Sequence, residues 1–565
     1  MARAAFTLRT EHLGPLPLVD HFLEHLGIDA ALDRAVPTRD RRARLATGKA
    51  LGVLLRSILV EREPIYRQHE TVAAFGAAAF GLTAAEADAL DDDQVGRALD
   101  RLFDADRGAL VTDVVLALKR RLRLDFGELH NDSTTVRFAG QYREAKGRTM
   151  RGKRAPFVTY GYSKDHRPDL KQLLYILTTS TDGVPVQFRV GDGNASDVTT
   201  HIETWETLRA LTGRPDFLYV ADSKLCAMES LEHLDRHKGR FVTVLPRSRQ
   251  EDAEFRRWIQ THEPEWDLVV DRPHPRREDG PRDRWWVFRS KLPSREGWPV
   301  IWVHSALLRL AQHESRRDRI ARAGDALDDL ARALASRRTR RRERAEVEDA
   351  VAALLERHHV RRYIRSAVKV ELDERFVQTR PGRPGKETHY RRLAKLRLRL
   401  EWTIDEAAVA CDQKSDGMYP LLTNDRSLTP AEVLAAHKRQ PTIEKRFEQL
   451  KDVLHIAPVF LKNEGRIEAF FLVYFLALLV SAVIERQLRH AMKREGIDQL
   501  PLYPEERSCR RPTTEQVFRL FSRVERHQLL ADDRLRQLFQ PQLTDLQHRV
   551  LSLLGVPAST YAGRQ

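Results

Sequence analysis

Cysteine is scarce in this sequence. The 565 residues include three cysteines, Cys226, Cys411 and Cys509, which lie far apart in the chain. No two of them have the Cys-x2-Cys spacing of a zinc site, and three distant thiols provide no framework of disulfide bonds. The sequence therefore excludes a disulfide-stapled secreted domain and a cysteine-based zinc domain. It predicts a protein of the reducing cytoplasm.

Long apolar segments are also nearly missing. The first residues, MARAAFTLRTEHLG, contain no apolar run of the length found in signal peptides, so export is not expected. One segment, residues 469–484 (AFFLVYFLALLVSAVI), carries no charge, but glutamates flank it at both ends. Its length falls short of the about 18 to 20 residues that cross a bilayer. We therefore predict a buried core helix and no membrane partner.

Positive charge is in excess. Lysine and arginine number 96 against 81 aspartates and glutamates, which gives a formal net charge of +15. Such a balance suits a polyanionic partner such as nucleic acid, although composition alone leaves an acidic membrane surface as an alternative. The length exceeds what one ordinary core supports, so about two to four domains are expected.

The residue pattern changes along the chain and predicts five regions. Residues 1–125 repeat apolar side chains at helical spacing between Pro and Gly positions, which predicts a helical N-terminal domain. Residues 126–250 predict the order β-β-β-α-β-α-β, with a hairpin turn at the sequence TDG. Residues 251–410 contain a cluster of six of the eight tryptophans, strand-like segments and a long charged helical pair. Residues 411–490 contain a strand, an amphipathic helix and the uncharged segment, and residues 491–565 predict a helical C-terminal region.

Two aspartates stand where a carboxylate needs an explanation. Asp132 lies within the first predicted strand, HNDSTT, although aspartate is a poor strand former. Asp222 ends the strand FLYVAD, and the carboxyl ends of parallel strands are where α/β sheets bind ligands. Each residue alone is also explained as a turn or capping residue. In a sheet whose fourth strand lies beside its first, the two carboxylates can converge.

A third acid lies on the amphipathic helix predicted over residues 441–456, PTIEKRFEQLKDVLHI. Its apolar positions repeat at helical spacing, which predicts one face packed on a core. Glu444, Glu448 and Lys451 form a second, polar stripe on another face. A solvated face is the ordinary explanation of such a stripe. Glu444 can instead join the two aspartates, and Glu448 is the alternative to Glu444.

Three converging carboxylates, without a cysteine or histidine pattern, favour cations that prefer oxygen ligands, Mg²⁺ or Mn²⁺. Two such ions about 3.5 to 4 Å apart can activate a water or a 3′-hydroxyl and stabilise the leaving oxygen of a phosphodiester. The basic balance fits this chemistry, because phosphates next to the cleaved bond need neutralisation. A metal-independent carboxylate-pair hydrolase acting on sugars is an alternative, which the net charge disfavours.

The segments HNDSTTV, FLYVADSK and IEKRFEQLK, with a helical region before them and a large insertion ahead of the glutamate, resemble the DDE transposases of bacterial insertion sequences. The likeness is to the subgroup with a Tyr-Arg-Glu-Lys signature. It implies an α/β fold with a ribonuclease-H-like catalytic core, formed by residues 126–250 and 411–490 and interrupted by a β-rich and helical insertion. A helical N-terminal domain and a helical C-terminal tail complete it. Asp132, Asp222 and Glu444 are then the catalytic residues and the ligands of Mg²⁺ or Mn²⁺.

The resemblance extends to basic residues near the glutamate. Lys451 stands where the signature has its lysine, and this implies that it contacts DNA phosphate. Arg439 and Lys445 are two further DNA-binding candidates. The sequence departs from the signature at two positions, because His437 and Gln440 occupy the places of its tyrosine and its arginine. The neighbouring arginine can substitute for the second of these.

The resemblance also implies a reaction and partners. The chain is expected to cleave phosphodiesters at transposon ends and to transfer the strands into target DNA by a cut-and-paste route. Its partners are then double-stranded DNA, as terminal inverted repeats and as target, and a second copy of the chain in a homodimer on DNA. The N-terminal domain is expected to help bind the terminal repeats, and the insertion to contact DNA ends. The alternative is a catalytically idle DNA-binding remnant or regulator, which three intact acids disfavour.

Overall fold

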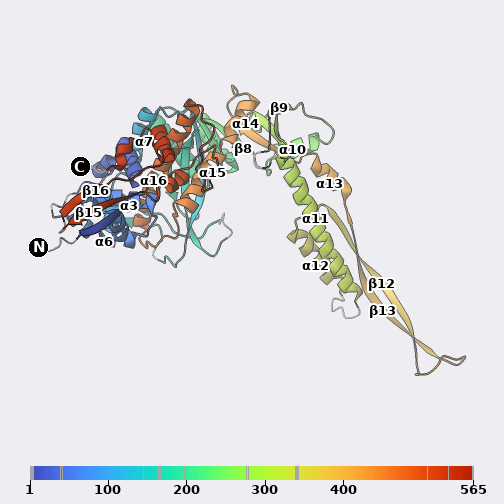
Figure 1. Cartoon of the computed structure of the whole chain (residues 1–565). Helices are drawn as coiled ribbons and strands as arrows, with labels where there is room; N and C mark the ends of the chain where they lie inside the picture. Colours follow the sequence, from blue (N-terminus) through green and yellow to red (C-terminus); the bar gives the residue numbers. More distant parts are fainter. Residues whose placement is uncertain are drawn as a thin grey trace. The chain divides into compact units, whose positions relative to one another are not determined.

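The computed structural model divides the chain into two compact units (Figure 1). The core unit comprises Met1–Thr243 and Ala435–Gln565, and the insertion unit comprises Val244–Leu434. The residues that the structure describes are 6–38, 40, 42–143, 145–162, 167–195, 197–274, 277, 279–336, 343–505, 507–531 and 534–562.

The centre of the core unit is a run of five neighbouring strands in the order β6-β5-β2-β7-β8. Their bounds are β2 (Glu128–Phe138), β5 (Lys171–Ser180), β6 (Pro185–Gly191), β7 (Leu218–Ala221) and β8 (Arg240–Val244). The first three of these pair antiparallel, whereas β7 runs parallel to both β2 and β8. The fourth strand of this set lies beside the first, as the sequence predicts. The α/β fold class is confirmed.

The β5–β6 hairpin follows directly from the sequence. Nearly every side chain of β5 (KQLLYILTTS) is buried, as expected for a strand covered on both faces. The chain reverses at the TDG segment, where the amide of Gly183 donates to the carbonyl of Ser180 at 2.9 Å. Gly183 has a φ of 75°, a left-handed conformation that glycine adopts without steric cost. The predicted hairpin turn is confirmed.

C-terminal helices cover one face of these strands. They are α15 (Pro441–Glu448), which continues into the single turn η4 (Gln449–Val453), and α16 (Glu464–Arg494). Phe471 of α16 contacts the rings of Phe138 in β2 and Tyr175 in β5, with ring centroids 6.4 and 5.9 Å apart. Alternate residues of a strand point to the same side. This face therefore also carries Asp132 of β2, six residues before Phe138.

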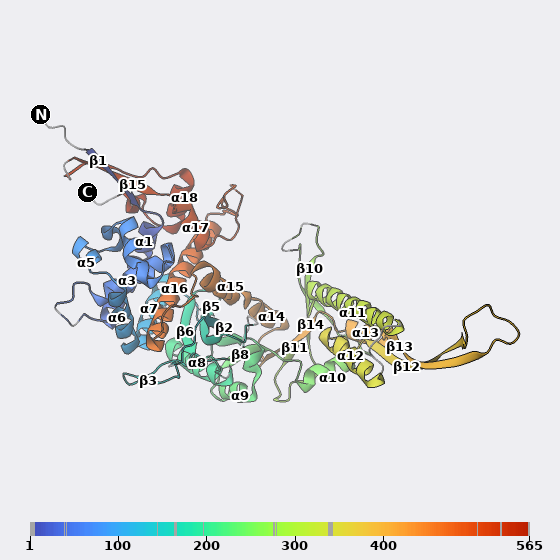
Figure 2. The ribbon, with the colours of Figure 1, turned by 90° about the horizontal axis from the view of Figure 1, so that it is seen from below.

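The opposite face is covered by the helices between β6 and β8. These are α8 (Asp197–Thr212), the turn η3 (Ser223–Cys226) and α9 (Met228–Arg236). Nδ1 of His201 in α8 lies 3.1 Å from the hydroxyl of Tyr219 in β7. Figure 2 shows α8 and α9 beside each other and apart from α15 and α16. The predicted order of elements is confirmed, with the two-residue strands β3 (Thr149–Met150) and β4 (Lys153–Arg154) in addition.

The uncharged segment forms the middle of α16. This helix is long and apolar enough to cross a membrane, yet 89% of its most apolar window is buried inside the structure. It packs on β6 and on three N-terminal helices, α1 (Leu16–Leu26), α3 (Thr47–Val60) and α6 (Asp92–Asp104). Gly465 permits a close approach to α6, because a side chain there would meet the ring of Phe103 at 3.0 Å. The prediction of a buried core helix is confirmed.

The N-terminal region is helical, as predicted, apart from one strand. Its helices are α1 (Leu16–Leu26), α2 (Ile28–Ala35), α3 (Thr47–Val60), η1 (Ile65–Arg67), α4 (Gln68–Phe75), η2 (Ala77–Phe80), α5 (Ala84–Asp88), α6 (Asp92–Asp104) and α7 (Arg107–Leu122). Aspartate side chains cap the N-termini of α6 and α7. Asp91 accepts a hydrogen bond from the amide of Gln94, and Asp106 accepts one from the amide of Ala109. The strand is β1 (Phe6–His12).

The C-terminal region is helical only in part, which corrects the prediction of a helical tail. Its helices are α17 (Thr514–Phe521), α18 (Asp545–Leu554) and η5 (Ala558–Tyr561), and its strands are β15 (Glu525–Ala531) and β16 (Arg534–Phe539). β15 pairs antiparallel with β1, so both ends of the chain share one three-stranded sheet. Strands this short show no distinct periodicity in the sequence, and the pairing joins segments at opposite ends of the chain.

The insertion unit contains four antiparallel strands in the order β14-β11-β10-β9. Its first elements are α10 (Gln250–Trp258), β9 (Asp267–Arg272), β10 (Asp283–Arg289) and β11 (Val300–Ser305), and its last are α13 (Glu406–Gln413), β14 (Met418–Thr423) and the first half of α14 (Pro430–Lys438). Trp302 of β11 stacks on Phe255 of α10 with ring centroids 3.6 Å apart. The strand-like segments predicted near the tryptophans are confirmed.

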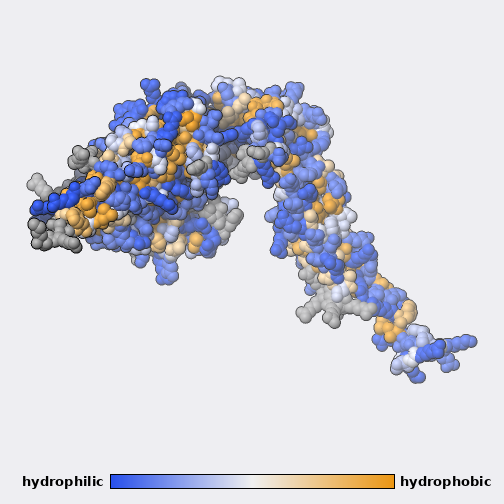
Figure 3. All heavy atoms as spheres, viewed as in Figure 1, coloured by the Kyte–Doolittle hydropathy of each residue, from blue (hydrophilic) through white to orange (hydrophobic). Residues whose placement is uncertain are grey.

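A helical pair and a β-ribbon form the rest of the insertion unit. They are α11 (Ala306–Ala335), α12 (Arg344–Arg357), β12 (Ile364–Gln378) and β13 (Tyr390–Ile404), and the two strands pair along their whole length to form the ribbon. Val368 and Leu400 are buried against the helices, whereas Leu372 and Leu396, farther along the same face, are exposed. Figure 1 shows the ribbon extending past α11 and α12, and Figure 3 shows apolar residues on its surface.

Candidate catalytic and metal-binding sites

Asp132 and Asp222 lie at corresponding positions of two neighbouring strands. β2 and β7 run parallel, with His130 opposite Val220. Asp132 follows His130 by two residues, and Asp222 follows Val220 by two. Because alternate residues of a strand point to the same side, both aspartates lie on one face of the sheet and at the same level along it. Neighbouring strands are about 4.8 Å apart. Burial, with smaller contributions from the charges of Asp222 and Asp132, raises the pKa of the Tyr219 hydroxyl. Both carboxylates are therefore within electrostatic reach of the same group.

Hydrogen bonds from nearby amides orient both aspartates. Oδ1 of Asp132 accepts from the amide of Ser133 at 2.7 Å. Oδ1 of Asp222 accepts from the amide of Lys224 at 3.1 Å and thereby caps the turn η3. The capping role considered for Asp222 from the sequence is thus real, and it is compatible with a second role. Both side chains are half-buried and remain accessible to a ligand.

Glu444 lies on the exposed side of α15, the helix that packs on β2 and β5. Gln440 fixes the start of this helix, because its Nε2 donates to the carbonyl of Asn131 at 3.2 Å. Asn131 directly precedes Asp132, so Glu444 belongs to a helix on the face that carries this aspartate. In the described part of the chain, the three predicted acids do not form a group whose ligand atoms all lie within 4.8 Å of one another. Their joint role stays a prediction.

Arg439 forms an ion pair with Glu128 at the start of β2. Its Nε and Nη2 donate to the two carboxylate oxygens, each at 2.5 Å. Nε2 of His130 lies 2.8 Å from Oε1 of the same glutamate. Burial opposes ionisation of Glu128, but the hydrogen bonds from His130 and Arg439 prevail and lower its pKa to about 2. Arg439 therefore ties the segment before α15 to β2, and its predicted contact with DNA stays a prediction.

The two positions that depart from the signature are both at least half-buried. Gln440 is buried, and its Oε1 lies 3.5 Å from Nδ1 of His130. His437, near the end of α14, is half-buried. Burial, with smaller effects from the charges of Lys438 and His130, lowers the pKa of His437 to about 4. The hydrogen bonds of Gln440 help to hold α15 near the strand that carries Asp132.

The lowered pKa of His437 predicts a pH dependence of stability. An unfolded histidine titrates near about 6.5, so between that pH and about 4 the unfolded chain binds a proton that the folded protein excludes. The stabilisation is complete above about pH 6.5 and is lost as the pH falls toward 4. Going from pH 7 to pH 5 should cost on the order of 2 kcal/mol at this residue. From pH 7 to pH 5 the unfolding midpoint should fall less in His437→Gln than in the unmodified protein. An equal fall in the two proteins would contradict the lowered pKa of His437.

Lys445 and Lys451 occupy different settings. Lys445 is exposed and pairs with Glu448. Lys451 is half-buried in η4, a π-helical turn that interrupts the regular helix predicted over residues 441–456. A π turn contains more residues than an α turn, so the polar stripe from Glu444 does not reach Lys451 at regular spacing. The prediction of one regular helix is corrected, and DNA binding by both lysines stays a prediction.

Sequence reasoning missed a buried ion pair below α15. Arg446 donates from Nε to the carbonyl of Gly183 at 2.7 Å and from Nη1 to Oε2 of Glu485 at 2.7 Å. Both side chains are at most 5% exposed. The pair joins α15 to α16 and to the β5–β6 turn. The only signal in the sequence is that Arg446 lies between the apolar residues Ile443 and Phe447, on the side of the helix that becomes buried.

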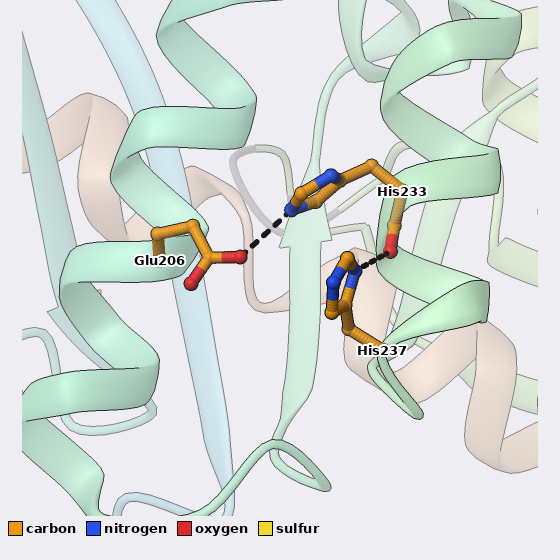
Figure 4. A group of neighbouring side chains, drawn as sticks. All are labelled: Glu206, His233 and His237. Atoms are coloured by element: carbon orange, nitrogen blue, oxygen red, sulfur yellow. Dashed lines mark hydrogen bonds and ion pairs between the residues drawn. The ribbon is translucent and has the colours of Figure 1, made fainter.

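A group of three side chains of metal-ligating types also escaped sequence reasoning. Glu206 of α8, His233 of α9 and His237, which follows α9, each place one ligand atom within 4.8 Å of the others (Figure 4). All three are half-buried. The spacing of the two histidines, four residues apart at a helix end, was available in the sequence. The glutamate comes from a different helix, so only the fold reveals the set.

Comparisons with known protein families agree with this architecture. The family model described as Transposase DDE domain matches residues 128–480, more than half of the chain. A second model, described as a domain of unknown function (DUF4277), matches residues 8–116, which include most of the N-terminal helices. A search of curated proteins finds no match. The Tyr-Arg-Glu-Lys subgroup stays a prediction. The chain belongs to the transposase DDE domain family.

Proposed function

We propose that this protein is a DNA transposase that cleaves phosphodiester bonds at transposon ends and joins the ends to target DNA by a cut-and-paste route. The observation that carries the proposal is the position of Asp132 and Asp222 on neighbouring parallel strands of a transposase DDE domain. The sheet, with three antiparallel strands followed by two parallel ones, is consistent with a ribonuclease-H-like core. The helix that bears Glu444 packs on the same face as Asp132.

The proposed ligands fit Mg²⁺ or Mn²⁺. Asp132, Asp222 and Glu444 offer carboxylate oxygens, which these hard cations prefer. The two aspartates are half-buried and the glutamate is exposed, so water and phosphate oxygens have access to them. Two ions about 3.5 to 4 Å apart need ligands on both sides, so the three carboxylates need not touch one another. When bound, such ions activate the attacking oxygen and stabilise the leaving oxygen.

The chain's own residues then hold the helix and bind the DNA backbone. The ion pair between Arg439 and Glu128 keeps the start of α15 on β2 and so sets the position of Glu444. Lys445 and Lys451 lie on the same helical segment and are proposed to contact phosphates that flank the cleaved bond. None of the three cysteines is in a disulfide bond, in keeping with action in the reducing cytoplasm.

The DNA is proposed to contact further regions of the chain. The ribbon with its tip, residues 364–404, contains eleven lysines and arginines against five aspartates and glutamates, a net charge of +6. This supports a role of the insertion, residues 251–410, in contacting DNA ends. We propose that the helical domain, residues 1–125, helps to bind the terminal inverted repeats. Residues 126–250 and 411–490 form the catalytic core in this proposal, residues 491–565 follow it, and two copies act together on paired ends.

Cleavage of DNA that carries the inverted repeats flanking the coding region tests the proposal. The purified full chain should cut such a duplex at the repeat ends in Mg²⁺ or Mn²⁺ and leave it intact in EDTA. A duplex with scrambled repeats is the matched control. Binding to the repeats without any cleavage, in either metal, would contradict the proposal and favour the idle DNA-binding alternative.

The choice of Glu444 over Glu448 gives a matched pair of variants. Both glutamates are exposed on α15, one helical turn apart. Glu444→Gln should lower cleavage by more than about 100-fold, because a lost metal ligand costs at least what a lost supporting residue does. Glu448→Gln removes only an exposed ion pair with Lys445 and should leave cleavage within about threefold. The reverse pattern would assign the ligand to Glu448.

A further inference from the structure

Three side chains on the face of the sheet away from α15 form a second polar group. Glu206 projects from α8, and His233 and His237 come from the end of α9 (Figure 4). Oε1 of Glu206 lies 2.8 Å from Nε2 of His233. Each residue offers a ligand atom within 4.8 Å of the other two. None of them belongs to the proposed catalytic set.

A hydrogen bond beside the group leaves the lone pair of His237 on its ligand nitrogen. Nδ1 of His237 lies 2.8 Å from the carbonyl oxygen of His233. A carbonyl oxygen only accepts, so Nδ1 carries the hydrogen and the lone pair of the neutral ring is on Nε2. The other carboxylate oxygen of Glu206 pairs with Arg209 at 2.7 Å. Such outer contacts fix ring and carboxylate orientations in known metal sites.

A buried indole holds the two rings in place. Trp205 is fully buried, and its ring centroid lies 5.9 Å from that of His233 and 6.2 Å from that of His237. The two imidazole centroids are 4.3 Å apart. After His237 the backbone passes close to the indole. A Cβ atom at Gly239 would lie 2.7 Å from the Trp205 ring, so only glycine fits there. Neighbouring groups therefore restrict both imidazoles, which lowers the ordering cost of binding an ion.

We propose that Glu206, His233 and His237 bind one late first-row divalent cation, with Zn²⁺ as the representative ion. Two imidazoles and one carboxylate are a common ligand set for Zn²⁺, whereas Mg²⁺ and Mn²⁺ prefer oxygen ligands. Three protein ligands leave a fourth position for water. The ion would replace the hydrogen bond between Glu206 and His233, with the proton of this neutral imidazole then on Nδ1, and would join α8 to α9. This site is separate from the proposed catalytic metals and does not depend on the proposed function.

Titration of the metal-stripped full chain tests this site. Isothermal titration calorimetry with Zn²⁺ should show one equivalent bound more tightly than any other, undiminished by millimolar Mg²⁺. His233→Gln and His237→Gln should each weaken this equivalent by about 100-fold or more. His25→Gln is the matched control and should leave it unchanged, since His25 also has a histidine four residues away on a helix, with ring centroids 6.3 Å apart.

Tryptophan fluorescence gives a second readout at the site itself. Trp205 is the single tryptophan of the core unit, and the other seven lie in the insertion unit. Cu²⁺ bound between the two histidines would lie next to this indole and quench its emission. One equivalent of Cu²⁺ should therefore remove a fixed part of the emission, and this part should be absent in Trp205→Phe.

The variants distinguish a metal site from an ordinary Glu–His pair. If Zn²⁺ binds with no equivalent sensitive to His233→Gln or His237→Gln, the proposal is wrong and the three residues form only a hydrogen-bonded cluster. Circular dichroism checks that each variant folds. If either histidine variant fails to fold, Glu206→Gln replaces it, because this change keeps the size of the side chain and removes its charge. Unchanged Zn²⁺ affinity in a folded Glu206→Gln protein would overturn the proposal.

Discussion

Cleavage of terminal-repeat DNA should fall by more than about 100-fold when Asp132 or Asp222 is exchanged for asparagine. Each exchange replaces a charged oxygen ligand by a neutral amide, so the affinity for Mg²⁺ falls while the shape of the side chain is kept. The position of the two residues on adjacent strands predicts that both variants fail in the same way. Cleavage is measured on an end-labelled duplex in saturating Mg²⁺ and again in Mn²⁺.

These two exchanges should leave the fold intact. Oδ1 of an asparagine can still accept a hydrogen bond from the amide of Ser133 at position 132 or from that of Lys224 at position 222. Asparagine is also a good capping residue. The unfolding midpoint should therefore stay within a few degrees, and binding to the repeats should persist. Asp216→Asn, which alters an exposed aspartate paired with Arg214, is the matched control and should cleave normally. Cleavage within about tenfold of the unmodified protein by Asp132→Asn would remove this residue from the proposed ligands.

Local patterns in the sequence predicted most of the core unit. The strand-type segment around HNDSTT, the apolar run of β5 and the TDG turn are short-range signals, and they identify these elements without knowledge of the fold. The uncharged segment likewise identifies α16 as buried. The closeness of Asp132 and Asp222 was predictable from the order of the strands, whereas their common level depends on the register that sets His130 opposite Val220.

Features that depend on distant contacts were not predictable. The pairing of β1 with β15 joins opposite ends of the chain, and nothing local in either strand announces its partner. The π-helical turn at Lys451 has no sequence marker comparable to proline or glycine. The hydrogen bond between Glu206 and His233 joins two helices that become neighbours only when the chain folds. In each case the local sequence is equally compatible with another interpretation, a regular helix or a solvated face.

The second large effect is expected from Arg446→Met, which should destabilise the core unit by about 3 to 5 kcal/mol. The exchange keeps an unbranched side chain in the buried site but leaves the Glu485 carboxylate, 5% exposed, without its nearest cation. Arg489 at 3.3 Å and the amide of Thr514 at 3.1 Å compensate only in part. Hydrogen exchange at the amides of α15 and α16 measures the loss without assuming that the whole chain unfolds in one step.

Removal of both partners separates the lost attraction from the uncompensated charge. The double variant Arg446→Met with Glu485→Gln should be more stable than Arg446→Met alone, because the buried side chain at position 485 is then neutral. Arg519→Met, which breaks an exposed pair with Glu515, should cost no more than about 1 kcal/mol and is the matched control. Arg446→Met should also reduce cleavage, since it loosens the helix that carries Glu444. If Arg446→Met were as mild as Arg519→Met, the buried pair would not be what fixes α15 on the sheet.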